Sequence, residues 1–462
     1  MNHSPGLHFL PWGSPPEQQG FQGGDLLGIV DRLDYLQDLG INALYLNPVF
    51  SSAANHRYHP YDHFQVDPLL GGEAALRELI DAVHTRGMRI ILDGVFNHAS
   101  RGFWPFHHIL ENGKKSPYID WFIVEDFPLR PYSSGPGKPA NYASWWGQPA
   151  LPKLNTRNPG VREYLFKAGQ HWIEFGADGW RLDVPAEIDD DSFWQEFRRV
   201  VKSANPEAYI VGEIWHAAQR WLGGDQFDGV MNYFFAKAAI SFFAKRTLNP
   251  DNHHPDLKFQ PELADKFRDR LDWQVRAYDW EIVQTQLNML DSHDSPRALW
   301  MAGGDISALR LAVLLQMTMP GAPCIYYGNE VGLTGGPDPL SRAAFPWHTP
   351  ESWDRDLLSF YRQAIALRRN TPALRTGQFY CLHAEGEQYI FLRQTHEQSV
   401  LVAFNAGDSR KEVPLATGRL QGRTYRQVWP VAGNLPVPAY EETISLSLPA
   451  RDALILVNGD SG

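Results

Sequence analysis

The chain has 462 residues, of which 43% are hydrophobic and 21% charged, and this composition excludes an intrinsically disordered protein. Its two cysteines, Cys324 and Cys381, allow at most one disulfide bond, which excludes a disulfide-stapled scaffold. The 42 basic and 53 acidic side chains give a formal net charge of −11, which argues against nucleic acid or an anionic membrane as a partner.

Eight short apolar runs predict buried β-strands. In chain order they are residues 6–13, 41–50, 88–96, 179–185, 208–215, 227–233, 285–294 and 322–330. Amphipathic segments such as 74–87 and 357–370 predict helices, and strand–helix alternation without hairpin signals indicates a parallel sheet. The repeats therefore predict an α/β fold with a (β/α)8 TIM barrel, whose strand C-terminal ends carry the chemistry.

Two segments depart from this alternation. Residues 99–155 are rich in Trp, Pro, Gly and Tyr and are too long for a plain loop, so they predict a subdomain inserted after the third strand. Beyond the barrel, apolar and polar residues alternate, which indicates a C-terminal antiparallel β-sandwich domain. We expect a barrel at residues 1–98 and 156–377, the insertion at 99–155, and the C-terminal domain at 378–462.

The N-terminal sequence has no basic start followed by an apolar stretch, so no secretory signal is expected. The longest apolar segment, residues 309–328, is interrupted by polar residues and prolines, so it predicts a helix, a turn and a strand rather than a membrane span. We therefore expect a soluble, cytoplasmic protein.

Three acids lie near the ends of separate predicted strands: Asp183, Glu213 and Asp294. Retaining glycoside hydrolysis needs a carboxylate nucleophile and a carboxylic acid about 5–5.5 Å apart, and neighbouring barrel strands can bring two acids together in this way. Arg181 lies two residues before Asp183, so both side chains point to one face of the strand. Taken singly, these residues are more typical of a structural ion pair or a turn cap. Their joint order favours catalysis, and the 13% aromatic content suits sugar rings.

Four segments carry a family resemblance: DGVFNH (93–98), GWRLDVPAE (179–187), VGEIW (211–215) and LDSHD (290–294). They resemble the ordered signature regions of the α-amylase family, glycoside hydrolase family 13. Four further segments resemble the neopullulanase, cyclomaltodextrinase and maltogenic amylase subfamily: LPKLN (151–155), FDGVMNY (227–233), GAPCIYYGNE (321–330) and TGGPDP followed by Arg342.

The resemblance implies roles for the three acids. Asp183 would be the nucleophile that forms a covalent glycosyl-enzyme intermediate, and Glu213 would be the proton donor and later the base. Asp294 would bind the sugar hydroxyls more tightly in the transition state. Arg181 would orient the nucleophile.

The resemblance also implies sugar-binding residues. His98 and His293 would hydrogen-bond the reacting glucose and Tyr58 would stack on it. Asp338 and Arg342 would contact the next sugar, and Trp215 and His216 would face the leaving-group sugars. Two alternatives stay open: Tyr58 as an interior barrel tyrosine, and Asp338 with Arg342 as a surface ion pair.

Two departures concern the chemistry. Where the subfamily has Val-Ala-Asn-Glu after the nucleophile, this chain has Val-Pro-Ala-Glu at 184–187, so the product profile does not carry over. Family members often bind Ca²⁺ at one of two sites. At the first site this chain keeps the ligand position Asn97, but Glu187 takes the place of a usual histidine ligand. At the second site Asp25 is the only obvious donor. We therefore expect no metal and no cofactor.

A third departure is length. Subfamily members carry an N-terminal β domain that builds a dimer, whereas this chain begins close to the first barrel strand. We therefore expect a monomer, or a homodimer that does not use such a domain.

Together these features predict a retaining hydrolase of α-1,4-glucosidic bonds that acts on malto-oligosaccharides, cyclodextrins or pullulan, with transfer to a sugar acceptor left open. The first alternative is a debranching enzyme that cleaves α-1,6 bonds. The second is a catalytically dead barrel that binds a partner, which the presence of all three acids disfavours.

Overall fold

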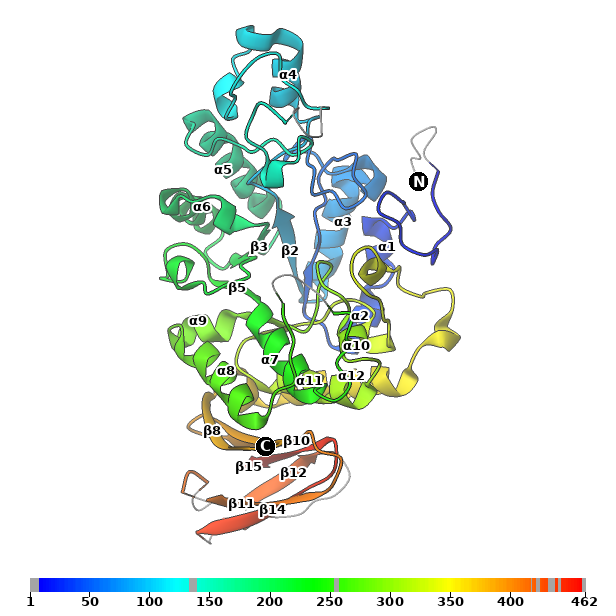
Figure 1. Cartoon of the computed structure of the whole chain (residues 1–462), viewed down its shortest axis with the longest axis vertical. Coiled ribbons are helices and arrows are strands. Elements are labelled where there is room, and N and C mark those ends of the chain that lie inside the picture. Colours follow the sequence, from blue (N-terminus) through cyan, green and yellow to red (C-terminus); the bar gives the residue numbers. More distant parts are fainter. Residues whose placement is uncertain are drawn as a thin grey trace. The chain divides into compact units, whose positions relative to one another are not determined.

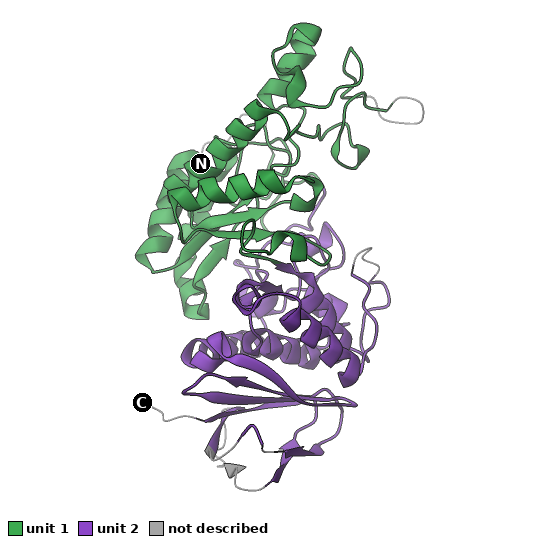
Figure 2. Ribbon diagram, turned by 90° about the vertical axis from the view of Figure 1, so that its left-hand side faces the viewer, with its two compact units in different colours: residues 1–12, 19–230 green, residues 13–18, 231–462 purple. Residues whose placement is uncertain are grey.

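The computed structural model describes residues 8–132, 139–252, 257–416, 418–420, 424–430, 437–438 and 442–458. The chain divides into two compact units, unit 1 with residues 1–12 and 19–230 and unit 2 with residues 13–18 and 231–462 (Figure 2). The predicted insertion and C-terminal domain extend in part beyond the described residues. The boundary between the units falls inside a strand of the parallel sheet, so the predicted domain limits stay a prediction.

In unit 1, parallel strands follow one another in chain order with helices between them (Figure 1). The strands are β1 (Ala43–Tyr45), β2 (Arg89–Gly94), β3 (Gly179–Leu182), β4 (Tyr209–Gly212) and the start of β5 (Gly229–Asn232), and the helices are α1 (Leu26–Val30), α2 (Leu33–Leu39), α3 (Gly72–Thr85), α4 (Trp104–Asn112), α5 (Pro159–Glu174) and α6 (Asp191–Ala204). All four β3 residues are buried, as expected for a parallel strand covered on both faces.

Unit 2 continues the same order. Met231 of β5 pairs in parallel with Leu287 of β6 (Leu287–Met289), and β6 pairs with β7 (Ala322–Cys324). The helices of this unit are α7 (Tyr233–Phe243), α8 (Ala264–Arg276), α9 (Trp280–Thr285), α10 (Ala298–Met301), α11 (Ile306–Thr318), α12 (Arg355–Asn370) and α13 (Pro372–Thr376). The seven strands β1–β7 confirm the seven predicted runs from residue 41 onward and the predicted α/β fold of barrel type.

The first predicted strand, residues 6–13, is wrong in its described part, because residues 8–13 form no strand. Pro11 has no N–H to donate to a sheet ladder, and Gly13 has a φ of 86°, which turns the chain. Leu10 donates its backbone N–H to the Phe21 carbonyl at 2.7 Å instead. Residues 6 and 7 lie outside the described residues.

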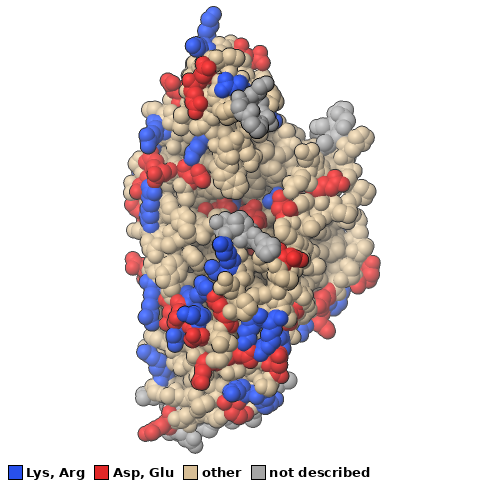
Figure 3. Space-filling view, viewed as in Figure 1, with Lys and Arg blue, Asp and Glu red and all other residues tan. Residues whose placement is uncertain are grey.

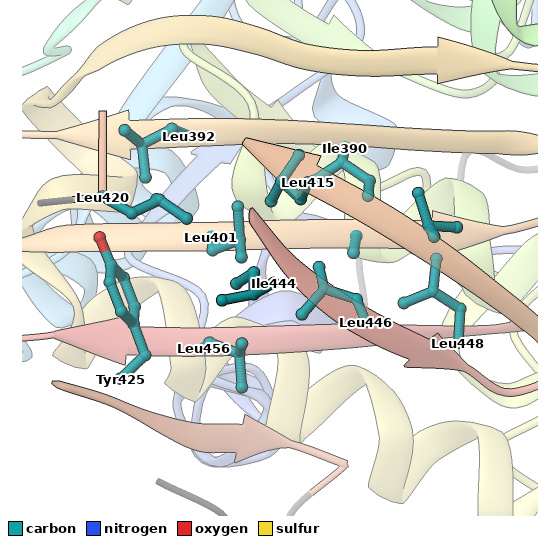
Figure 4. Close-up of a cluster of buried hydrophobic side chains, with 12 residues drawn as sticks. Ile390, Leu392, Leu401, Leu415, Leu420, Tyr425, Ile444, Leu446, Leu448 and Leu456 are labelled. Carbon is teal, nitrogen blue, oxygen red and sulfur yellow. The ribbon is translucent and has the colours of Figure 1, made fainter. Parts of the chain in front are cut away.

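The C-terminal part is an antiparallel sandwich, as predicted. One sheet has the order β13-β12-β15-β10-β9-β8 and the other pairs β11 with β14. Their bounds are β8 (Gln378–Glu385), β9 (Gln388–Gln394), β10 (Ser399–Asn405), β11 (Lys411–Ala416), β12 (Thr424–Trp429), β13 (Val437–Pro438), β14 (Thr443–Leu448) and β15 (Asp452–Asn458). Alternate side chains of the two sheets form one buried cluster, which includes Leu401 of β10 and Leu446 of β14 (Figure 4). This period of two is the pattern that sheet packing requires.

A buried arginine fastens this sandwich to the helices of unit 2. Arg393 of β9 has no exposed surface, and its guanidinium donates to the carbonyls of Thr318 at 2.6 Å, Leu374 at 2.8 Å and Gly377 at 2.8 and 3.0 Å. These carbonyls lie at the C-terminal ends of α11 and α13, where helices leave acceptors unsatisfied. Burial, and secondarily the charge of Arg368, lowers the pKa of Arg393 well below its usual value.

None of the helices in the described ranges is long and apolar enough to cross a membrane.

We predict that Arg393→Met lowers the free energy of unfolding by about 3 kcal/mol or more, because it leaves buried carbonyls without donors. Denaturant unfolding measures the change. Arg276→Met is the matched control, since the Arg276 side chain is 79% exposed, and we expect a change within about 0.5 kcal/mol. Equal effects of the two substitutions would contradict this anchoring role.

Candidate active site

One buried guanidinium contacts three carboxylates at the ends of three adjacent strands. Nη1 of Arg181, on β3, lies 3.0 Å from Oδ2 of Asp93 and 3.1 Å from Oδ1 of Asp183, and Nη2 lies 3.0 Å from Oε2 of Glu213. Asp93 is on β2, Asp183 follows β3 and Glu213 follows β4, and these strands pair in register. The structure therefore brings Asp183 and Glu213 to the same cation, as the spacing of the motifs predicts.

All four of these charged side chains are at least nine-tenths buried. Burial alone would lower the pKa of Arg181, but the charges of Asp93 and Glu213 raise it well above its usual value. The guanidinium therefore stays charged at any working pH. A fixed buried cation attracts the carboxyl groups around it and holds them in place.

Glu213 receives two further donors. The indole Nε1–H of Trp215 donates to Oε1 at 3.0 Å, and the backbone N–H of Val184 donates to Oε2 at 3.0 Å. Val184 has φ 37° and ψ 50°, a left-handed conformation that is strained for a β-branched residue. This strained turn directly follows Asp183, so it points a backbone donor at the neighbouring carboxylate.

Two tyrosines and Asp93 extend the network behind Arg181. The hydroxyl of Tyr58 donates to Oδ2 of Asp93 at 2.8 Å, and that of Tyr45 donates to the same oxygen at 3.2 Å. Tyr58, predicted to stack on the sugar, is thus tied by its hydroxyl to the base of the site. Sequence reasoning did not single out Asp93. Its signal was a lone carboxylate at the end of the otherwise apolar run IILDG.

His98 is fully buried and neutral. Desolvation lowers its pKa to about 3, against a raising effect of its hydrogen bond to Tyr58. Because a carbonyl can only accept, Nε2–H of His98 donates to the Tyr58 carbonyl at 3.1 Å, and Nδ1 accepts from Nδ2 of Asn97 at 3.3 Å. The ring stacks on Trp145 of the insertion, with centroids 4.8 Å apart and planes 5° apart.

Four further predicted residues form a second cluster, which lies in unit 2. Nε2 of His293 is 2.8 Å from Oδ2 of Asp294, and Nη2 of Arg342 is 3.5 Å from Oδ1 of Asp294. Nε of Arg342 lies 3.0 Å from the His293 carbonyl and 3.0 Å from Oδ1 of Asp338. The two clusters belong to different compact units, so their joint action in one site stays a prediction.

The predicted leaving-group residues differ in position. Trp215 is half-buried and bonded to Glu213, whereas His216 is exposed and its ring lies 5.6 Å from that of Trp221. His216 has no contact with the carboxylates among the interactions of the described residues. Only Trp215 is therefore joined to the charged network in this structure.

Glu187 is paired with a lysine. The ammonium of Lys153 lies 2.8 Å from the Glu187 carbonyl and 3.4 Å from its carboxylate, so a positive charge already occupies this position. Asp25 caps helix α1 by accepting from the backbone N–H of Gly28. Among the residues that the structure describes, no group of three or more His, Cys, Asp or Glu side chains is placed to hold a metal ion.

Comparison with known proteins identifies the family. Residues 14–349 match the alpha amylase catalytic domain, and residues 380–459 match the alpha amylase C-terminal all-beta domain. The cyclomaltodextrinase of a Bacillus species is 46% identical over 86% of this chain and 68% of its own length. Neopullulanase 2 of Thermoactinomyces vulgaris is 41% identical over 99% of this chain and 75% of its own length.

The alignment with one solved structure spans nearly the whole of both proteins. The debranching enzyme of Nostoc punctiforme, in its native form, has a TM-score of 0.90 and 46% identity over 95% of this chain and 90% of its own. The chain belongs to the α-amylase family of glycoside hydrolases. This confirms the predicted family, the enzyme class and α-glucan hydrolysis at the level of the family.

We predict that His98 contributes to the pH dependence of stability. A histidine whose pKa is about 3 in the folded state and about 6.5 in the unfolded state makes the fold less stable as pH falls below about 6.5. Between pH 7 and pH 5 this contribution is about 2 kcal/mol. His98→Gln should therefore lose less stability over this interval, as measured by denaturant unfolding. An unchanged pH dependence would contradict the assignment of a neutral His98.

Proposed function

We propose that this enzyme cleaves α-1,4-glucosidic bonds with retention of configuration, through a covalent glycosyl-enzyme intermediate. The observation that carries the proposal is the pair of contacts from Arg181 to Asp183 and to Glu213. A single cation that touches two carboxylates holds them close together, which suits a nucleophile and an acid on one bond.

In the first step, a carboxylate oxygen of Asp183 attacks the anomeric carbon while the glycosidic bond breaks. A protonated Glu213 gives its proton to the leaving oxygen, which departs as a sugar hydroxyl. In the second step Glu213, now ionised, takes a proton from water, and the water oxygen displaces Asp183 from the anomeric carbon. Protons and charge balance over the two steps, and the chemistry needs no cofactor.

The second cluster has a complementary role in this proposal. Asp294, oriented by His293 and Arg342, would hydrogen-bond sugar hydroxyls as the ring flattens towards an oxocarbenium ion. Interactions that strengthen only in the transition state raise kcat rather than ground-state binding. Asp338 is held by Arg342, which supports its proposed contact with the adjacent sugar.

The names of the relatives support malto-oligosaccharides, cyclodextrins and pullulan as substrates. A second candidate, α-1,6 debranching, is favoured by the similarity to the Nostoc debranching enzyme over nearly the whole of both chains. Both reactions use the same two carboxylates. They differ in how the leaving sugar is placed beside Glu213, where Trp215 lies.

We further propose a cytoplasmic location and no polyanionic partner. Cys324 and Cys381 are both free, which is compatible with a reducing compartment. On the face shown in Figure 3, acidic and basic side chains are interspersed rather than gathered into a basic band.

Product analysis on pullulan tests the bond preference. Pullulan consists of maltotriose units joined by α-1,6 bonds. Cleavage of the α-1,4 bonds within these units is the proposed reaction, so we predict panose as the main product. Maltotriose would instead support the debranching candidate and contradict the α-1,4 proposal. Hydrolysis of β-cyclodextrin to malto-oligosaccharides in a parallel assay serves as the positive control for α-1,4 cleavage. No product from either substrate would contradict both candidates.

A further inference from the structure

One large aromatic side chain is exposed in a costly backbone conformation. Trp146 of the insertion is 75% exposed, and its φ of 49° and ψ of 26° lie in the left-handed region. Such a conformation costs a residue with a Cβ about 1 kcal/mol or more, and exposure of an indole ring forgoes the benefit of burial. A strained, exposed tryptophan that neither packs in the core nor suits the turn conformation it adopts is typical of a functional position.

Trp146 is the outer member of a stack of three rings. Its ring lies 4.4 Å from that of Trp145, with 19° between the planes, and Trp145 in turn stacks on His98. His98 is fully buried, Trp145 is half-buried and Trp146 is exposed, so the stack runs from the interior to the surface. Since Trp145 covers one face of Trp146, the opposite face of that indole is the one available to a ligand.

The backbone around the stack is fixed on both sides. Trp145 donates its N–H to the Leu151 carbonyl at 2.9 Å, and Leu151, which is buried, donates to the Gln148 carbonyl at 3.0 Å. Ser144 forms an antiparallel bridge with Pro152. These bonds hold Trp146 at the tip of a closed turn, so its ring is presented without a large loss of entropy on binding.

We propose that the exposed face of Trp146 binds a glucosyl ring of an α-glucan chain, at a position separated by two aromatic layers from His98. A flat indole provides an apolar surface for the C–H groups of a pyranose, and its stacking on Trp145 keeps that surface oriented. Because His98 belongs to the proposed catalytic region, a sugar bound on Trp146 is a glucosyl residue of the same glucan molecule that lies far from the bond to be cleaved. The inference thus rests on the proposed function and adds a preference for longer substrates.

The test uses Trp146→Asn, because asparagine tolerates the left-handed conformation and the substitution removes the ring without adding backbone strain. The matched control is Tyr132→Ala. Tyr132 lies in the same insertion and is 76% exposed, but its ring packs against Arg101 instead of the stack. Both substitutions are made in the Asp183→Asn background, so that binding of maltoheptaose and of maltotriose is measured by calorimetry without turnover.

We expect Trp146→Asn to weaken maltoheptaose binding about three- to tenfold, with maltotriose binding little changed, because only the longer chain reaches the outer ring. Tyr132→Ala should leave both affinities unchanged. A melting temperature of each variant equal to that of the parent shows that the fold is retained.

Four results would overturn the proposal. Maltoheptaose affinity equal to the parent's in Trp146→Asn, or an equal loss in Tyr132→Ala, contradicts a glucan platform while leaving the proposed function in place. A changed oligomeric state of Trp146→Asn in sedimentation, with unchanged glucan affinity, assigns the ring to a contact between chains instead. Absence of α-glucan binding in the parent as well contradicts the proposed function itself.

Discussion

The guanidinium of Arg181 is a full positive charge without exposed surface, and burying such a charge costs free energy unless acceptor groups around it compensate it. Asp93, Asp183 and Glu213 supply that compensation from the ends of three neighbouring strands. The register of β2, β3 and β4 therefore has an electrostatic consequence as well as a packing one. A shift of one residue in any of these strands would turn a carboxylate away from the cation and leave a buried charge uncompensated.

The same interaction connects stability with chemistry. The carboxylates that neutralise Arg181 include the two acids proposed to act on the glycosidic bond, so the reactive groups are held by the fold before substrate arrives. Val184 adds to this pre-organisation, because its strained backbone directs an N–H to Glu213. His98, kept neutral by burial, adds polar contacts near the charged centre without adding another charge.

Much of this arrangement could be predicted from the sequence. The seven apolar runs from residue 41 onward, each followed by polar residues, were enough to place Asp183 and Glu213 at adjacent strand ends. The run at residues 6–13 was misinterpreted because its apolar content outweighed Pro11 and Gly13, which prevent a ladder there.

Other features had no clear sequence signal. Arg393 looks like one more polar residue in an alternating strand, and only the packing of β9 on α11 and α13 shows that it is buried. The left-handed conformation of Val184 could not be predicted either, because β-branched residues rarely adopt it and nothing in the sequence indicates it at this position. The stack of His98 on Trp145 depends on how the insertion folds back onto the segment after β2, where Leu154 donates its N–H to the Asn97 carbonyl, and periodicity does not predict this.

In the proposed mechanism, Asp183 forms a covalent bond to the sugar while Glu213 transfers the proton. Mass spectrometry of Glu213→Gln treated with α-maltosyl fluoride tests it most directly, because fluoride leaves without protonation and the second step then lacks its base. We expect the peptide containing Asp183 to gain the mass of one maltosyl group. A label on another residue, or hydrolysis of the fluoride with inversion and no labelled peptide, would contradict it.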